Sequence, residues 1–181
     1  MTLPQDARLA RVVLGSGALT RLSPILEADR AQAVADLASG SRFAPLAANP
    51  GAAKPGTVNP GTPHPGPPAP GPYELHLSVW EGRLVFDVRH IDGAKVLLLG
   101  LALGPFRGLI KDYQLLVESH AKAVEEGRES RIQAIDMGRR GLHNEGAALL
   151  CQRLDGKIAI DFETARRLFT LVCVLHTRVQ G

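Results

Sequence analysis

Cysteine and aromatic residues are scarce in this chain of 181 residues. Its two cysteines, Cys151 and Cys173, lie in apolar stretches and form no Cys-x-x-Cys pair. We therefore expect both to be free thiols that pack as small hydrophobic groups. Aromatic side chains make up 4% of the residues, which is little material for the stacking platform on which single-strand binders hold bases.

A large excess of positive charge is also missing. The 21 lysines and arginines stand against 18 acidic residues and give a net charge of only +3, whereas duplex nucleic acid usually requires a dense basic patch. We therefore do not expect nucleic acid as a partner.

Long hydrophobic runs are absent as well. The longest, Val96 to Gly104 and Leu168 to Leu175, are too short to span a bilayer. The first 15 residues lack the apolar core of a signal peptide. We expect no membrane partner and a cytoplasmic location.

Sequence motifs for common cofactors and metals are missing too. There is no phosphate-binding loop, no dinucleotide-binding glycine fingerprint and no Gly-x-Ser-x-Gly elbow. His143 and Glu145 are two positions apart, whereas a zinc-binding helix needs histidines four positions apart. We therefore expect no cofactor and no metal ion.

Residues 1–41 predict a strand and a helix of a single domain. Arg8 to Leu14 has the length and the β-branched content of a strand, which could lie at a sheet edge. Ser23 precedes a proline at the first helical position, and apolar residues follow at helical spacing. This pattern predicts a helix from Pro24 to about Ser39.

Residues 42–72 differ abruptly in composition from the rest of the chain. They contain ten of the 13 prolines, and a proline recurs every five residues from Pro45 to Pro70, usually followed by glycine. This repeat has few apolar side chains to bury, so we interpret 42–72 as a disordered or polyproline-like insertion of low complexity. An alternative is that Pro67 to Pro70 docks on a partner with an aromatic groove.

Residues 73–181 return to the same domain and begin with three strand-like segments. Tyr73 to Val79 and Arg83 to Arg89 alternate apolar and polar residues, which is typical of half-buried antiparallel strands joined by a tight turn. The third segment, Lys95 to Leu103, is apolar on both faces. We therefore expect it in the interior of the sheet, covered at least in part by helices.

Helical patterns fill the remainder of the chain. A wide apolar face extends from Gly104-Pro105 to Gly127, and Ser130 with Gln133 is typical of a capping box for a second helix over residues 131–154. Asp161 can cap a last helix from Phe162 to about Val179. The chain is thus predicted to be an α+β domain, in which a small antiparallel meander packs against three or four helices.

The last helix is almost apolar all round between Leu168 and Leu175. Such a helix is either buried in the centre of its own domain or paired with a second subunit. A homodimer or other homo-oligomer through residues 162–179 is therefore one of two open alternatives.

Gly138 and Gly141 are unexpected in the segment 131–154. Each costs a helix on the order of 1 kcal/mol relative to alanine. Their presence calls for a close approach of a ligand or another backbone. The alternative is a break at these glycines that divides the segment into two short helices.

Candidate site residues are the polar side chains of the segment Ile135 to Leu150, joined by two arginines of the last helix. Spacings of four residues put several of them on about half of a helix circumference, and paired guanidinium groups bind oxyanions bidentately. The predicted ligand-binding residues are Asp136, Arg139, Arg140, His143, Asn144, Glu145, Arg166 and Arg167. The other interpretation is a network that holds two helices together, in which the arginines pair with Asp136, Glu145, Asp161 and Glu163.

Several segments resemble one known family. Ile135 to Gly146, Pro105-Phe106-Arg107, Lys111-Asp112-Tyr113 and Thr164 to Leu171 resemble a UPF-type family of uncharacterised alphaproteobacterial proteins. The resemblance covers most of the chain outside the proline repeat, and it implies no established activity and no catalytic residue. The chain departs from the family pattern in the proline repeat and at Ala28-Asp29-Arg30, where His-Glu-Arg is expected.

Three functional hypotheses remain open. The leading hypothesis is a non-enzymatic binding or regulatory domain that recognises an anionic ligand or a protein partner through the face from Arg139 to Glu145. The alternative is an enzyme that acts on a phosphorylated or carboxylated small molecule, with His143 as general acid or base. A third hypothesis, RNA binding, predicts an affinity that falls steeply with salt.

Overall fold

The computed structural model describes residues 3–15, 22–48 and 65–179. A four-stranded sheet has the order β1-β4-β5-β6, and a smaller three-stranded sheet has the order β3-β2-β7. The elements are β1 (Leu9–Leu14), α1 (Pro24–Gly40), β2 (Phe43–Ala48), β3 (Pro65–Pro68), β4 (Tyr73–Trp80), β5 (Arg83–His90), β6 (Lys95–Ala102), the 3-10 turn η1 (Gly104–Phe106), α2 (Arg107–Glu125), α3 (Glu129–Leu154), β7 (Ile158–Ile160) and α4 (Phe162–Val179). The α+β prediction is therefore confirmed.

The predicted meander forms the centre of the larger sheet. β4 and β5 pair in antiparallel register from Tyr73 with His90 to Trp80 with Arg83. The turn between them places Glu81 and Gly82 at φ angles of 47° and 71°, as expected of a tight hairpin turn. β1 runs parallel to β4 at one edge of the sheet, so the edge position that the sequence suggested is confirmed.

β6 lies at the opposite edge, and the prediction that it lies in the sheet interior is wrong. β5 is the neighbouring strand with which β6 pairs. Leu101 is buried on the inner face, whereas Leu98 on the outer face is 70% exposed. The continuous apolar pattern therefore reflects an uncovered outer face as well as a buried inner one.

The boundaries predicted for the proline insertion are too wide. Phe43 is fully buried and begins β2, which pairs with both β7 and β3. Pro45 has no N–H, yet its carbonyl accepts a hydrogen bond from the amide of Ala69 at 3.2 Å. Residues 49–64, with most of the pentad repeat, lie outside the described part of the chain. The prediction thus overlooked the apolar residues that flank the repeat.

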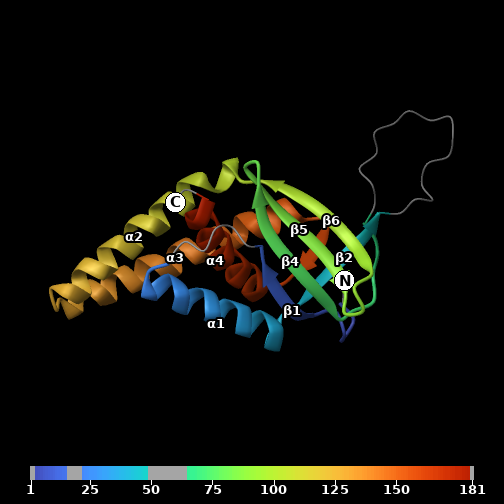
Figure 1. Ribbon diagram of the computed structural model, residues 1–181, viewed down its shortest axis with the longest axis horizontal. Helices are drawn as coiled ribbons and strands as arrows, with labels where there is room; N and C mark the ends of the chain where they lie inside the picture. The colour runs from blue at the N-terminus through green and yellow to red at the C-terminus, as the bar shows by residue number, and fades with distance from the viewer. Residues whose placement is uncertain (1–2, 16–21, 49–64, 180–181) are drawn as a thin grey trace.

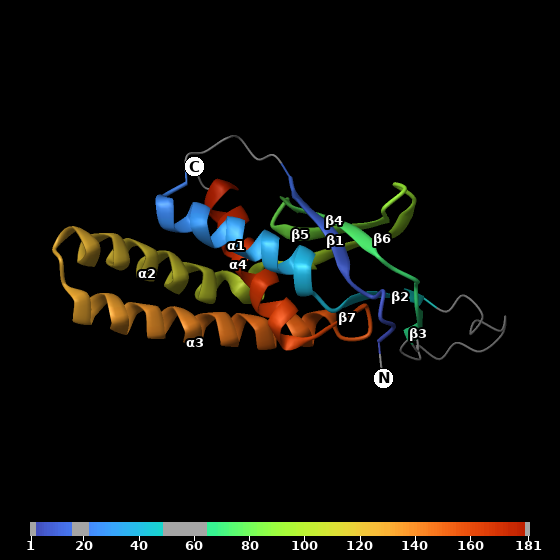
Figure 2. The ribbon, with the colours of Figure 1, turned by 90° about the horizontal axis from the view of Figure 1, so that it is seen from below.

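The helices form the second layer of the molecule (Figures 1 and 2). α2 and α3 make a long antiparallel hairpin, and α4 lies between this hairpin, α1 and the larger sheet (Figure 2). α3 is continuous, so the alternative of a break at Gly138 to Gly141 is wrong. The capping box is also wrong, because α3 already begins at Glu129 and no side chain caps it. No helix in the described ranges has the length and apolar content needed to cross a membrane.

α4 is the centre of the hydrophobic core. Asp161 Oδ1 accepts a hydrogen bond from the amide of Thr164 at 2.8 Å, as the predicted cap requires. Every residue from Leu168 to Leu175 is buried by α1, α2, α3 and β4 of the same chain. Of the two alternatives for this helix, the central position is therefore the one observed, and its apolar stretch offers no surface for a homodimer through 162–179.

Candidate functional site

A partly buried ion pair joins the middle of α3 to α1. Arg139 Nη2 donates to Asp29 Oδ2 at 2.5 Å, and the hydroxyl of Tyr113 on α2 donates to the same oxygen at 2.5 Å. Arg139 Nη1 also contacts Asp136 Oδ1 at 3.2 Å. The side chains of Arg139 and Asp29 are only 14% and 20% exposed. Arg139 therefore already pairs with two carboxylates and links α3 to α1.

The pKa values in this cluster follow from burial and from the shared carboxylate. Burial, followed by the charge of Asp29, raises the pKa of Tyr113 well above its ordinary value. Burial alone would lower the pKa of Arg139, but Asp29 and Tyr113 outweigh it and the pKa is raised. Tyr113 thus stays protonated and Arg139 stays charged, which keeps the three-residue contact intact at neutral pH.

His143 lies one turn further along α3, against aromatic side chains. Its ring centroid is 5.4 Å from that of Tyr113 and 6.3 Å from that of Phe169. Burial, with the nearby charge of Arg139, lowers the pKa of His143 to about 4. The imidazole is therefore neutral at pH 7. Its Nε2 is buried and makes no hydrogen bond to any residue that the structure describes.

A shallow hollow of about 180 Å³ opens between α1, α3 and α4 beside this imidazole. It is lined by Asp36, His143, Glu163, Arg166, Arg167 and Thr170. An adjoining hollow of about 160 Å³ shares four of these side chains and extends to Asp29, Gln32 and Ala33. His143 therefore lines both hollows.

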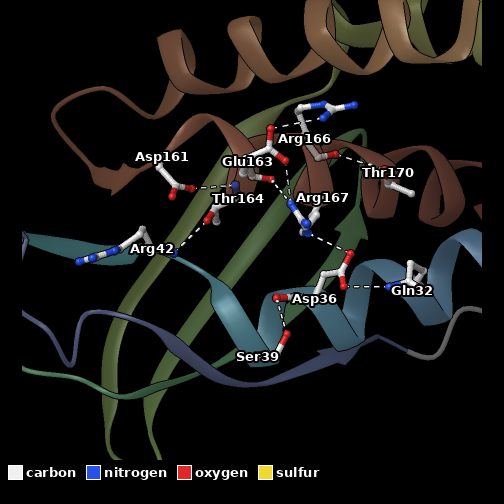
Figure 3. A network of polar contacts seen from close by, with 10 residues as sticks. All are labelled: Gln32, Asp36, Ser39, Arg42, Asp161, Glu163, Thr164, Arg166, Arg167 and Thr170. Atoms are coloured by element: carbon white, nitrogen blue, oxygen red, sulfur yellow. Dashed lines mark hydrogen bonds and ion pairs between the residues drawn. The ribbon is translucent and has the colours of Figure 1, made fainter. Parts of the chain in front are cut away.

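Figure 3 shows how the charged side chains of this depression meet. Glu163 accepts from Arg166 Nη1 at 3.3 Å and from Arg167 Nη1 at 3.0 Å. Arg167 Nε also pairs with Asp36 Oδ2 on α1 at 3.1 Å (Figure 3). The hydroxyl of Thr170 donates to the carbonyl of Arg166 at 3.2 Å. One carboxylate thus lies between two guanidinium groups at the rim of the hollow.

The structure divides the predicted site residues into three groups. His143, Arg166 and Arg167 meet at the hollow, whereas Asp136 and Arg139 belong to the neighbouring ion-pair cluster. The side chains of Arg140, Asn144 and Glu145 are exposed and do not line the hollow. The predicted residues therefore do not share one surface. The prediction grouped side chains over about half of the circumference of α3, and some of those positions point away from α4.

Asp29, Tyr113, Asp36 and Thr170 belong to the site and were not among the predicted residues. Asp29 had a signal in the sequence, because it lies in the segment that departs from the family pattern and keeps a carboxylate where glutamate is expected. Tyr113 lies in one of the segments that carry the resemblance. Within residues 3–15, 22–48 and 65–179, no group of three His, Cys, Asp or Glu side chains is placed to hold a metal ion.

In α3, the glycine that permits close packing is Gly146. A Cβ atom there would lie 2.4 Å from the ring of Phe169, whereas a Cβ at Gly141 would meet nothing within 4 Å. At Gly138 the nearest atom is a methyl group of Leu116 at 3.4 Å, an ordinary contact. The close approach expected at Gly138 and Gly141 therefore occurs one to two turns later, where α3 crosses α4.

Comparison with known proteins identifies relatives but no activity. Residues 6–178 match an uncharacterised protein family, UPF0262. A UPF0262 protein of Granulibacter bethesdensis is 61% identical over 172 residues, which cover 95% of this chain and 91% of the relative. Relatives from Acidiphilium cryptum and Xanthobacter autotrophicus are 56% and 44% identical, and each comparison covers 94% of this chain and 93% of the relative. No solved structure matches the chain significantly. The chain belongs to the UPF0262 family.

Proposed function

We propose that this protein is a non-enzymatic binding domain that holds a small anionic group, a phosphate or a carboxylate, in the hollow between α1, α3 and α4. The observation that carries the proposal is His143, which lines the hollow and whose buried Nε2 makes no hydrogen bond to a described residue. Buried polar atoms nearly always have a hydrogen-bond partner. A neutral imidazole can donate through Nε2, and an oxyanion is a suitable acceptor.

Arg166, Arg167 and Glu163 support an anionic ligand. Glu163 already places a carboxylate between the two guanidinium groups, which is the arrangement that a bound oxyanion requires. The Glu163 side chain is 60% exposed, and exposed pairs of this kind contribute only about 0 to 1 kcal/mol. A ligand can therefore displace Glu163 at little cost.

The size of the hollow favours one small anionic group over a larger ligand. Its volume of about 180 Å³ is below the roughly 300 to 1,000 Å³ of sites that enclose drug-sized molecules. The side chains that remain for binding are Arg166, Arg167 and His143. Arg139 is excluded from this role because its partner Asp29 is only 20% exposed, whereas Glu163, the partner of Arg166 and Arg167, is 60% exposed and can move aside.

The enzymatic alternative has less support. A general acid or base works best when its pKa lies near the operating pH. The pKa of His143, about 4, makes it unprotonated and only weakly basic at pH 7. His143 is better suited to donate one hydrogen bond to a ligand than to transfer protons.

Isothermal titration with inorganic phosphate and with succinate, at constant ionic strength, tests the proposal. Arg166→Gln should weaken binding at least tenfold because it removes a guanidinium group from the hollow. Glu163→Gln should strengthen binding several-fold because it removes the competing carboxylate. Arg140→Gln, an exposed arginine of α3, is the matched control and should bind as the parent does. Equal affinities for Arg166→Gln and Arg140→Gln, or no binding of either probe, would overturn the proposal.

We also propose a cytoplasmic location, supported by two cysteines that are both free, as is usual in reducing compartments. Fractionation of a bacterium that carries the native gene tests this. Recovery of the protein in the cytoplasmic fraction is expected, and recovery in the periplasmic or membrane fraction would contradict the proposal.

A further inference from the structure

A second and larger cavity, of about 630 Å³, lies between the first half of α2 and the end of α4. Arg107, Ile110, Lys111, Gln114 and His176 line it. It shares no lining residue with the hollow beside His143. Its volume lies within the roughly 300 to 1,000 Å³ typical of small-molecule sites, so it can enclose more than a single anionic group.

Positive charge gathers on one wall of this cavity. Arg107 and Lys111 are four residues apart and therefore lie on the same face of α2. Among the residues that the structure describes, neither forms an ion pair, and no acidic side chain lines the cavity. Arg139, by contrast, is held by two carboxylates. The two cations of α2 thus remain available to an anion.

Uncharged polar groups also line this cavity. Nδ1 of His176 is buried and has no hydrogen-bond partner among the described residues. Burial, with the nearby charge of Arg107, lowers the pKa of His176, so the ring is neutral at neutral pH and can donate or accept one hydrogen bond. Gln114 Nε2 donates to Thr177 Oγ1 at 3.3 Å, which holds the amide across α2 and α4. The fully buried Ile110 supplies an apolar floor.

We propose that this cavity binds a phosphorylated small molecule, with Arg107 and Lys111 on the phosphate and with Gln114 and His176 on a polar part of the same ligand. A phosphate monoester carries close to two negative charges at neutral pH, which two cations one helical turn apart match. The guanidinium fork can bond two phosphate oxygens and the ammonium group provides a point charge. Both cations belong to segments that carry the family resemblance, and neither takes part in the hollow beside His143.

Ribose 5-phosphate, with inorganic phosphate and ribose as partial probes, tests the site on the full-length chain. Isothermal titration at constant ionic strength should show that Arg107→Gln with Lys111→Gln weakens the binding of ribose 5-phosphate at least tenfold. Lys122→Gln, an exposed lysine in the last turn of α2, is the control for a loss of positive charge and should not change it. Arg140→Gln, an exposed arginine of α3 that lines neither this cavity nor the hollow beside His143, should also leave it unchanged.

Imidazole ¹⁵N NMR supplies a readout at the site itself. The Nδ1 resonance of His176 should shift on addition of ribose 5-phosphate to the parent protein, and it should not shift in the double variant. Arg107 and Lys111 are exposed, so urea unfolding should show that the double variant is as stable as the parent. An unmoved His176 resonance, or equal affinities for the double variant and Lys122→Gln, would overturn the proposal.

Discussion

Arg139 on α3 and Asp29 on α1 lie 110 positions apart in the sequence and form a partly buried ion pair of 2.5 Å. Removal of one partner of a buried pair leaves an uncompensated charge, which typically costs about 3 to 5 kcal/mol. Because this pair is only partly buried, Arg139→Ala should lower the free energy of unfolding by about 3 kcal/mol, the lower end of that range. Arg140→Ala removes the adjacent exposed arginine and should change it by less than about 0.5 kcal/mol. Urea unfolding measures both values.

A double variant shows whether Asp29 is the partner that matters. Arg139→Met combined with Asp29→Leu removes both charges and leaves none buried. Because apolar replacement of a whole buried pair is often nearly neutral, the double variant should be more stable than Arg139→Ala alone. A double variant that is less stable than the single one would show that the pair is not the cause of the loss.

Tyr113 contributes to the same cluster through one hydrogen bond to a charged acceptor, the carboxylate of Asp29. Such bonds contribute about 1.5 to 3 kcal/mol, whereas bonds between neutral groups contribute about 0.5 to 1.5 kcal/mol. Tyr113→Phe should therefore destabilise the protein more than Tyr73→Phe, because the hydroxyl of the equally buried Tyr73 donates to the neutral carbonyl of Ala69. Thermal and urea unfolding of the two variants test this order. The reverse order would mean that the hydrogen bond from Tyr113 to Asp29 contributes less to stability than a bond to a neutral carbonyl.

Local patterns were sufficient to predict most of the elements. The alternation in Tyr73 to Val79 and the helical spacing before Gly127 are set by side chains that are neighbours along the chain, and these elements were predicted correctly. The position of Lys95 to Ala102 in the sheet was not predicted correctly. An edge strand whose outer apolar face is uncovered has the same apolar pattern as a strand in the interior of the sheet. The strand that begins at Phe43 was missed because the high proline content of the segment was given more weight than the apolar residues Phe43 and Ala44, which are buried.

The site was only partly predictable for a similar reason. The four-residue spacing of Arg139 and His143 predicts that they share a face of α3, and the structure places them together with Tyr113. The partner of Arg139, Asp29, is brought there by the packing of α1 on α4, which no local pattern encodes. Arg139 and Arg140 are adjacent arginines whose side chains leave α3 in different directions. Residue type alone therefore could not predict which of them is paired and which is exposed.

His143 should make folding stability depend on pH between pH 7 and pH 5. Its pKa is about 4 in the folded chain, whereas an unperturbed imidazole has a pKa of 6.5. The unfolded chain therefore binds the proton more readily, so stability is complete above pH 6.5 and falls as the pH falls toward 4. Between pH 7 and pH 5 the free energy of unfolding should fall by about 2 kcal/mol more in the parent than in His143→Gln. Urea unfolding at both pH values gives this difference, and identical losses would contradict the buried, neutral imidazole.

Two glycines of α3 should respond to the same substitution in opposite directions. Gly146→Ala places a Cβ atom 2.4 Å from the fully buried ring of Phe169, and overpacking of this kind typically costs about 1 to 3 kcal/mol. Gly141→Ala meets nothing within 4 Å and gains the helix preference of alanine, which is about 0.5 to 1 kcal/mol. The free energy of unfolding should therefore be lower than the parent's in Gly146→Ala and higher than the parent's in Gly141→Ala. If Gly141→Ala were also destabilising, that glycine would serve something other than helix packing, and a ligand or partner at the exposed side of α3 would be the first explanation to test.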